Sequence, residues 1–175
     1  MDLSQCLIKL NFGLLCSGLA NVPIACDDFV TSYYTAINDG KNLTSFYIKP
    51  DSTSPQADIS LNGRIVTDPE QLQAIFQKDV GKCTYDCQSY DCQVLNTNYN
   101  VGAPEHMLAP NKDGKKLSIL LMVSGGVKYR DSAEGEVRGF SESIILVPNW
   151  NAQGPKASKG LKKWLIQSQT FRLVV

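Results

Sequence analysis

The second half of the chain alternates between apolar and polar residues in the manner of β-strands. Four long strands are predicted, at roughly residues 82–95, 117–130, 138–148 and 163–174. Along the second of these strands every other residue is apolar, so one of its faces should be buried. That face is formed by Leu117, Ile119, Leu121, Val123 and Val127. Because loops join the strands, the sequence predicts a mainly antiparallel sheet.

Helical patterns occupy the first half of the chain. From residue 25 to residue 38, apolar residues recur at the spacing of an amphipathic helix. A short helical piece is predicted at residues 42–47, and Asp68 followed by Pro69 is typical of the start of a third helix. Helices followed by long antiparallel strands predict an α+β fold, with three helices packed on one face of the sheet.

The length of 175 residues is that of one domain. We assign residues 25–175 to this domain and residues 1–24 to an N-terminal extension or a first helix. The N-terminal segment is largely apolar, but Pro23 breaks it and it is too short to span a bilayer, so no membrane association is predicted. A secretory signal peptide is the alternative reading of this segment.

The charges of the chain balance, with 17 Lys and Arg against 17 Asp and Glu. The chain therefore has no net field that would attract a nucleic acid. Two connections, at residues 96–116 and 148–160, are predicted to be exposed loops. Basic runs lie in or beside them, formed by Lys112, Lys115 and Lys116 and by Lys156, Lys159, Lys162 and Lys163. These lysines either touch RNA phosphates weakly or are simply solvated.

The sequence gives no indication of catalysis or of a bound metal. Its six cysteines lack the paired spacing of zinc sites, and His106 is the single histidine. We expect reduced, mostly buried thiols. The chain has no glycine-rich phosphate loop and no nucleophile elbow. We therefore predict no enzymatic activity, no catalytic residue, no metal site and no cofactor.

The second face of the predicted sheet mixes small polar and apolar residues and lacks the dense Lys and Glu of a solvated face. Such a composition is typical of a surface that packs against a partner. The alternative is a monomer with a half-apolar open sheet. On the last strand, alternation puts on one side the residues Trp164, Ile166, Thr170 and Arg172. We predict a partner interface formed by Leu120, Met122, Ser124, Ser143, Ile145, Thr170 and Arg172.

Arg172 is expected to be the main polar anchor of this interface. A guanidinium in a desolvated interface needs a carboxylate from the partner, and leaving it unpaired is costly. The alternative is an ion pair within the chain, with an acid such as Glu142.

Short motifs follow one another along the chain in a specific order and spacing. They are Phe29-Val30-x-x-Tyr33-Tyr34, Leu43-x-x-Phe46-Tyr47, Leu61-Asn62-Gly63, Leu72-x-x-Ile75-Phe76, Asp91-Cys92-Gln93, Ser124-Gly125-Gly126-Val127-Lys128, Phe140 to Leu146, and Trp164-x-Ile166 with Phe171-Arg172. In this order, from Ala25 to Val174, the chain resembles the nuclear transport factor 2-like family. Within that family it is similar to the small partner subunit of the general mRNA export receptor.

The resemblance implies a cone-like α+β domain whose curved sheet packs against a related domain of a larger mRNA export receptor subunit. It implies a non-catalytic heterodimer subunit that supports mRNA export, meets nuclear pore proteins through the heterodimer, and shuttles between nucleus, nuclear pore and cytoplasm. On the family pattern, the dimer face includes positions that match Met122, Ser143, Thr170 and Arg172. Residues 96–116 correspond to a strand-connecting loop that tends to be long in fungal members.

Two alternatives share the same fold. The first is a homodimeric import carrier for the GTPase Ran, which has Trp-Glu-Gly where this chain has Leu61-Asn62-Gly63 and acidic residues near the position of Arg130. The second is an enzyme with a cavity between helices and sheet, which would need ionisable groups there. The candidates for such groups are Tyr33 and Tyr34, and a core role with one hydroxyl bonded is the simpler interpretation.

Overall fold

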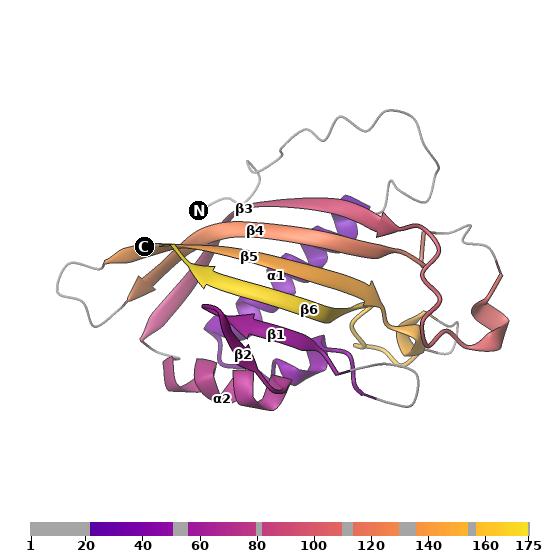
Figure 1. Ribbon diagram of the computed structural model, residues 1–175, viewed down its shortest axis with the longest axis horizontal. Helices are drawn as coiled ribbons and strands as arrows, with labels where there is room; N and C mark the ends of the chain where they lie inside the picture. Colours follow the sequence, from indigo (N-terminus) through magenta and orange to yellow (C-terminus); the bar gives the residue numbers. More distant parts are fainter. Residues whose placement is uncertain are drawn as a thin grey trace.

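The computed structural model describes residues 22–50, 56–79, 82–109, 114–129, 136–153 and 157–174. Six strands form one sheet: β1 (Asp58–Leu61), β2 (Arg64–Val66), β3 (Cys83–Asn96), β4 (Ser118–Tyr129), β5 (Val137–Pro148) and β6 (Trp164–Leu173). The order across the sheet is β2-β1-β6-β5-β4-β3 (Figure 1). Among the pairs of described strands only β1–β6 is parallel, so the prediction of a mainly antiparallel sheet is confirmed.

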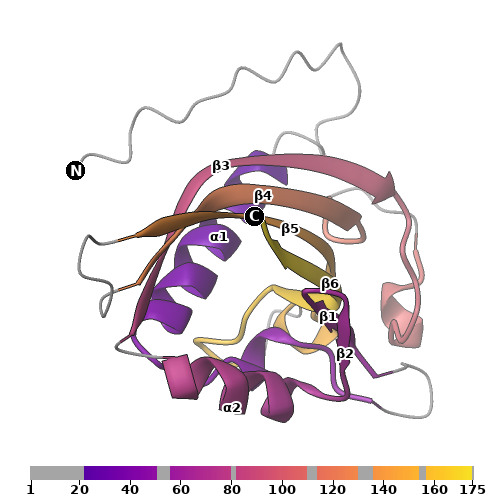
Figure 2. The ribbon, with the colours of Figure 1, turned by 60° about the vertical axis from the view of Figure 1, so that its left-hand side comes forward.

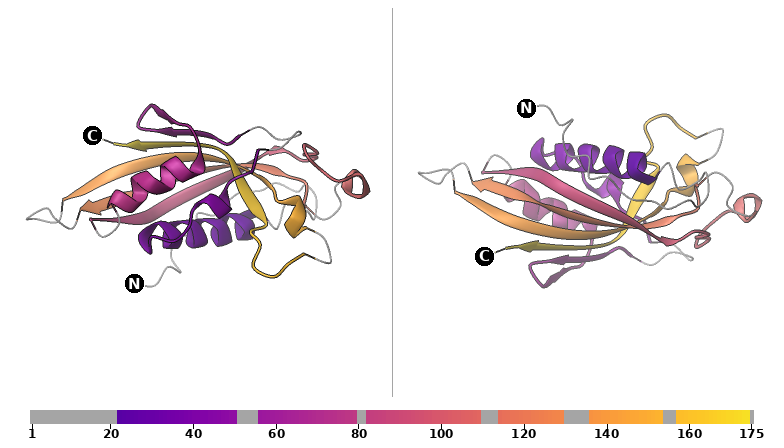
Figure 3. Two further views of the ribbon diagram at one scale, coloured as in Figure 1. Left: turned by 90° about the horizontal axis from the view of Figure 1, so that it is seen from below. Right: turned by 90° about the horizontal axis from the view of Figure 1, so that it is seen from above.

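Two α-helices, α1 (Val22–Asn38) and α2 (Pro69–Asp79), lie on one side of the described sheet. The sheet curves around them, as Figure 2 shows, and Figure 3 shows both helices on the same side from two further directions. The buried side of α1 includes Cys26, Phe29 and Tyr33, as the spacing predicts. At the start of α2, the backbone N–H of Gln71 donates to Asp68 Oδ1 at 2.7 Å, which confirms the predicted cap.

The prediction of three helices is wrong for the described part of the chain, because residues 42–47 do not form an α-helix. They contain a three-residue 3-10 turn, η3 (Thr44–Phe46). The side chain of Asn42 accepts hydrogen bonds from the backbone N–H of Thr44 at 2.8 Å and from its hydroxyl at 2.6 Å. Such local bonds compete with helix formation, and the segment is too short to overcome them.

The N-terminal boundary of the domain was expected at residue 25, and α1 begins at Val22. Residues 1–21 lie outside the described residues, as do parts of both basic runs, including Lys112 and Lys156. The assignment of residues 1–24 to an extension or a first helix therefore stays a prediction.

The core lies between α1 and the helix side of the sheet. The alternate residues of β4 that were predicted to be buried are at most 2% exposed, from Leu117 to Val127. Aromatic rings fill the space between strands and helix: Phe140 and Phe171 stack with centroids 5.3 Å apart, and Phe29 and Tyr33 stack at 5.5 Å. This burial is the main source of the fold's stability.

Gly125 on β4 sits where neighbouring strands crowd together. A Cβ atom at this position would lie 2.1 Å from the backbone oxygen of Asp86 on β3 and 2.6 Å from the ring of Phe140 on β5. The ladder between β3 and β4 shifts register nearby, between Cys87 and Ser89. Gly125 therefore permits a close approach that no other residue allows.

Some polar groups of the two long loops form hydrogen bonds to the backbone of the protein. Trp150 lies in the turn η5 (Trp150–Ala152), and its indole N–H donates to the Val101 carbonyl at 2.8 Å. The ammonium of Lys116 donates to the Ala109 carbonyl at 2.8 Å, and Lys116 is only 6% exposed. Lys116 therefore stabilises the loop. The expectation that its side chain is exposed to solvent is wrong. The loop also contains a short turn, η4 (Glu105–Met107).

No disulfide joins the described cysteines, which are Cys26, Cys83, Cys87 and Cys92. Cys26 hydrogen-bonds to Cys92, and this bond together with burial raises the pKa of the Cys26 thiol. Across the ranges that the structure describes, no three His, Cys, Asp or Glu side chains are arranged to hold a metal. Neither described helix has the length and apolar character needed to cross a membrane.

Candidate partner interface

The sheet face that points away from the helices, here called the open face, is built from aligned rows of side chains. One row crosses the sheet from β2 to β3 and consists of Ile65, Ser60, Thr170, Ser143, Met122 and Asp91. On one side of it runs a row of Arg172, Ser141, Ser124 and Ser89. On its other side runs a row of Asp58, Ser168, Ile145, Leu120 and Gln93. All seven residues predicted for the interface therefore share this face.

The centre of the open face is uncharged and partly apolar. Met122 is 38% exposed, and Leu120 and Ile145 beside it are half-buried although neither described α-helix covers them. Ser124 and Ser143 are exposed and offer hydroxyl groups that can donate or accept hydrogen bonds. A core of aliphatic side chains with hydroxyls between them can pack closely against another protein surface.

Arg172 lies at the margin of the open face, at the end of β6 that the β1–β2 hairpin holds. The backbone N–H of Leu173 donates to Asn62 Oδ1 at 2.8 Å, and the N–H of Val174 donates to the Gly139 carbonyl at 2.8 Å. Asn62 has a φ of 52°, in the left-handed region that the turn of a two-residue hairpin requires. Arg172 is exposed, and no carboxylate among the described residues forms an ion pair with it.

The alternative of an ion pair between Arg172 and Glu142 is wrong. Glu142 pairs with Phe171 across the ladder, so its side chain points to the helix side of the sheet, opposite to Arg172. It is only 3% exposed. Glu142 is therefore not the partner of the Arg172 guanidinium.

Trp164 and Ile166 lie on the helix side, so their predicted placement with Thr170 and Arg172 is wrong. Ile145 pairs with Ser168 and Leu146 pairs with Ile166, which leaves Gln167 as an extra residue in β6. Such a bulge reverses the alternation on either side of it. Ile166 is accordingly fully buried in the core.

A connected set of polar side chains is buried under the helices. Gln169 Nε2 donates to the Tyr33 hydroxyl at 2.7 Å and to Glu142, and Gln169 Oε1 accepts from Tyr47. The hydroxyls of Tyr33 and Tyr47 are 2.9 Å apart, and Tyr34 donates to Glu142. The sequence indicated Tyr33 and Tyr34, whereas the places of Tyr47, Glu142 and Gln169 in this set were missed. An isolated Glu between Phe140 and Ile144, on a face that is otherwise apolar, was the signal available.

This polar set lies in the core, where each of the five side chains is at most 6% exposed. Burial raises the pKa of Glu142 from 4.5 to about 6, although hydrogen bonds from Tyr34 and Gln169 act in the opposite direction. Each of the five side chains is bonded to another of them, and none lines either of the large clefts on the helix side. A general acid or base must reach its substrate, so these groups are poorly placed for catalysis.

The raised pKa of Glu142 predicts a pH-dependent stability. The folded protein keeps the proton up to about pH 6, whereas the unfolded chain loses it near 4.5. The bound proton of Glu142 therefore adds about 2 kcal/mol to the free energy of unfolding below pH 4.5. This contribution is lost as the pH rises through 6. Urea unfolding of the wild type and Glu142→Gln between pH 4 and 7 measures it as the difference between the two pH profiles. Parallel profiles would contradict the buried, protonated state.

Solved structures that resemble this fold include Mtr2 in two complexes with Mex67 and a further structure of Mtr2. Mtr2 in a complex described as a Sac3N peptide bound to Mex67:Mtr2 is 31% identical, covers 87% of this chain and 98% of that chain, and has a TM-score of 0.77. The chain belongs to the nuclear transport factor 2-like family. Within this family it is similar to Mtr2 of Chaetomium thermophilum, complexed with the Mex67 NTF2-like domain, at 30% identity with the same coverage and TM-score. A further structure of Mtr2 is 28% identical, with a TM-score of 0.74.

More distant members of the nuclear transport factor 2-like fold support the architecture alone. Aln2 from a Streptomyces species has a TM-score of 0.54 at 12% identity, over 92% of this chain and 94% of that chain. No family model and no curated protein sequence matches the chain.

Proposed function

We propose that the chain is the non-catalytic small subunit of a heterodimeric mRNA export receptor. Its open face would pack against a related domain of the larger subunit, with the seven predicted residues in the contact. The observation that carries the proposal is the likeness to Mtr2, at 31% identity over 98% of that chain, in a complex with Mex67. A second support is the uncharged centre of the open face, which includes Met122 and Ser143.

The energetics of the open face favour a large partner surface. Burying Leu120, Met122 and Ile145 from their present exposure would contribute hydrophobic free energy, at roughly 25 cal/mol for each Å² removed from water. The serine hydroxyls around these three residues can pair with polar groups across the contact, so their burial need not cost free energy. Charges lie at the margins, where water can still reach them.

Within this proposal the heterodimer, and not the small subunit alone, carries mRNA through nuclear pores. The protein would then be found in the nucleus, at the pore and in the cytoplasm. Mex67:Mtr2 with a bound Sac3N peptide gives an example of such a heterodimer that takes a further protein ligand. The Ran-carrier alternative has less support, because the turn at Asn62 serves here to hold β6 and carries no acidic side chain.

Charge reversal at Arg172 tests the proposed anchor. Arg172→Glu would place a carboxylate where the partner supplies one, and we expect binding to the Mex67 NTF2-like domain to weaken about a hundredfold. The matched control is Arg64→Glu, at an exposed position in β2 whose side chain belongs to the opposite face. Titration calorimetry measures the affinity of each variant for this domain. Equal affinity of the two variants would remove Arg172 from the anchor role.

A further inference from the structure

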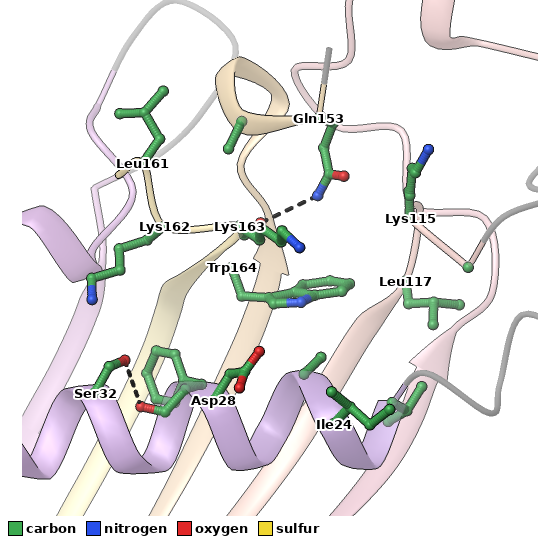
Figure 4. A pocket seen from close by; sticks show the side chains of 15 residues that line it. Ile24, Asp28, Ser32, Lys115, Leu117, Gln153, Leu161, Lys162, Lys163 and Trp164 are labelled. Carbon is green, nitrogen blue, oxygen red and sulfur yellow. Dashed lines mark hydrogen bonds between the residues drawn. The ribbon is translucent and has the colours of Figure 1, made fainter. Parts of the chain in front are cut away.

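A cleft of about 680 Å³ opens on the helix side of the sheet, at the end where α1 begins. The first turns of α1, residues 114–117, the turn η5 and residues 161–164 surround it. Figure 4 shows the indole of Trp164 across the middle of the cleft, above α1. The open face lies on the other side of the sheet, so a partner that packs there leaves this cleft free.

The cleft offers an apolar floor and an apolar rim. Phe29 and Leu117 belong to the hydrophobic core and form part of the lining, and Trp164 is only half-buried above them. Leu161 and Ile24 are 44% and 62% exposed at the edge. A half-buried indole between aliphatic side chains can pack against one aromatic or large aliphatic group of a ligand.

Three lysines line the loop side of the cleft: Lys115, Lys162 and Lys163. They come from the two basic runs, which the fold brings together although they are far apart in the sequence. Lys162 is held with its ammonium 4.3 Å from the centre of the Phe46 ring. In the described part of the chain, no carboxylate forms an ion pair with Lys162 or Lys163. The opposite wall, on α1, carries Asp28.

We infer that this cleft binds an acidic peptide segment of a partner protein, which inserts one aromatic or large aliphatic side chain against Trp164. Carboxylates of the segment would face Lys163, and Asp28 can accept hydrogen bonds from the backbone N–H groups of the segment. The net charge of the whole chain is zero, so the excess of lysines is a local property of this site.

Single-stranded RNA fits the same cleft less well. A polynucleotide needs a continuous basic track for its phosphates beside the aromatic platform. Here Asp28 lies in the lining, and Asp27 lines the adjoining groove along α1, so phosphates on this side would be repelled. A peptide can place apolar and polar groups on the α1 side and its carboxylates on the loop side.

The test uses short fluorescein-labelled acidic peptides that differ only in one central residue, which is alanine, leucine, phenylalanine or tryptophan. Fluorescence anisotropy measures their binding to the 175-residue chain, purified alone or with its receptor partner. We expect the aromatic peptides to bind about tenfold more tightly than the alanine peptide, because they bury a large apolar side chain. A lysine-rich peptide with the same central residue should not bind.

A pair of charge-reversal variants and an NMR titration show whether the peptides bind in this cleft. Lys163→Glu should weaken binding of the aromatic acidic peptides about tenfold, whereas Lys128→Glu, an exposed lysine at the margin of the open face, should have no effect. The chain has two tryptophans, so its NMR spectrum contains two indole signals, which Trp150→Phe assigns. The signal of Trp164 should move on titration and that of Trp150 should not. This readout does not require a Trp164 variant to fold.

Three results would overturn the inference. The first is equal binding of acidic and lysine-rich peptides, and the second is unchanged binding by Lys163→Glu. The third is binding of an oligouridylate that Lys163→Glu abolishes while the acidic peptides fail to bind, which would make this an RNA site. None of these results bears on the heterodimer, because the cleft and the open face lie on opposite sides of the sheet.

Discussion

Met122→Asp is expected to abolish the heterodimer while leaving the subunit folded. Met122 lies in the row that crosses all six strands, between Ser143 on β5 and Asp91 on β3. A carboxylate here would be buried without a counter-charge when the partner docks, and it would also be repelled by Asp91. Such a buried, unpaired charge costs about 3 kcal/mol or more, which corresponds to a loss of affinity of more than a hundredfold. Calorimetric titration with the Mex67 NTF2-like domain measures the loss.

The control for Met122→Asp is Ile24→Asp, which introduces the same carboxylate at an exposed position on α1. This control should bind the receptor domain as the wild type does, because α1 lies on the helix side of the sheet. Both variants should melt close to the wild-type temperature, since both positions are exposed in the isolated chain. Full-strength binding by Met122→Asp would show that the open face is not the contact.

Gly125→Ala is expected to be the most destabilising single-methyl addition in the sheet. Its Cβ would meet the backbone oxygen of Asp86 at 2.1 Å and the Phe140 ring at 2.6 Å, and a backbone atom cannot rotate away as a side chain can. Overpacking of this kind costs about 3 kcal/mol or more. For a chain of this size that corresponds to a fall in melting temperature of roughly 6–12 °C.

Gly139→Ala, on the neighbouring strand β5, is the matched control. A Cβ at this position would find its nearest neighbour, Val174 Cβ, at 3.5 Å, which is an ordinary van der Waals contact. The variant should unfold within a few degrees of the wild type in thermal scans followed by circular dichroism. Similar melting temperatures for the two glycine variants would mean that β3 and β4 are less closely packed than the structure indicates.

The local features of the fold could be predicted because their signals are local. Alternation along residues 117–127 revealed the buried face of β4, and Asp68 with Pro69 marked the start of α2. The seven residues predicted for the open face share one face because the ladders between β4, β5 and β6 keep one register around Met122 and Ser143.

The features that were missed depend on single insertions and on distant contacts. The extra residue Gln167 places Trp164 and Ile166 on the helix side of the sheet instead of the open face. The alternation of apolar residues does not reveal such a bulge. Gln169 is a polar residue in the core because its partners, Tyr33 and Tyr47, come from elsewhere in the chain. The cleft around Trp164 was invisible for the same reason, since its walls come from four separate parts of the sequence.

The heterodimer is tested most directly by light scattering after size exclusion. The chain is measured alone and after co-expression with the Mex67 NTF2-like domain, because an open sheet face that is half apolar should favour a partner over water. We predict a stable one-to-one complex that is less prone to aggregate than the lone chain. A well-behaved homodimer, or a clean monomer, that ignores the receptor domain would contradict the proposed function.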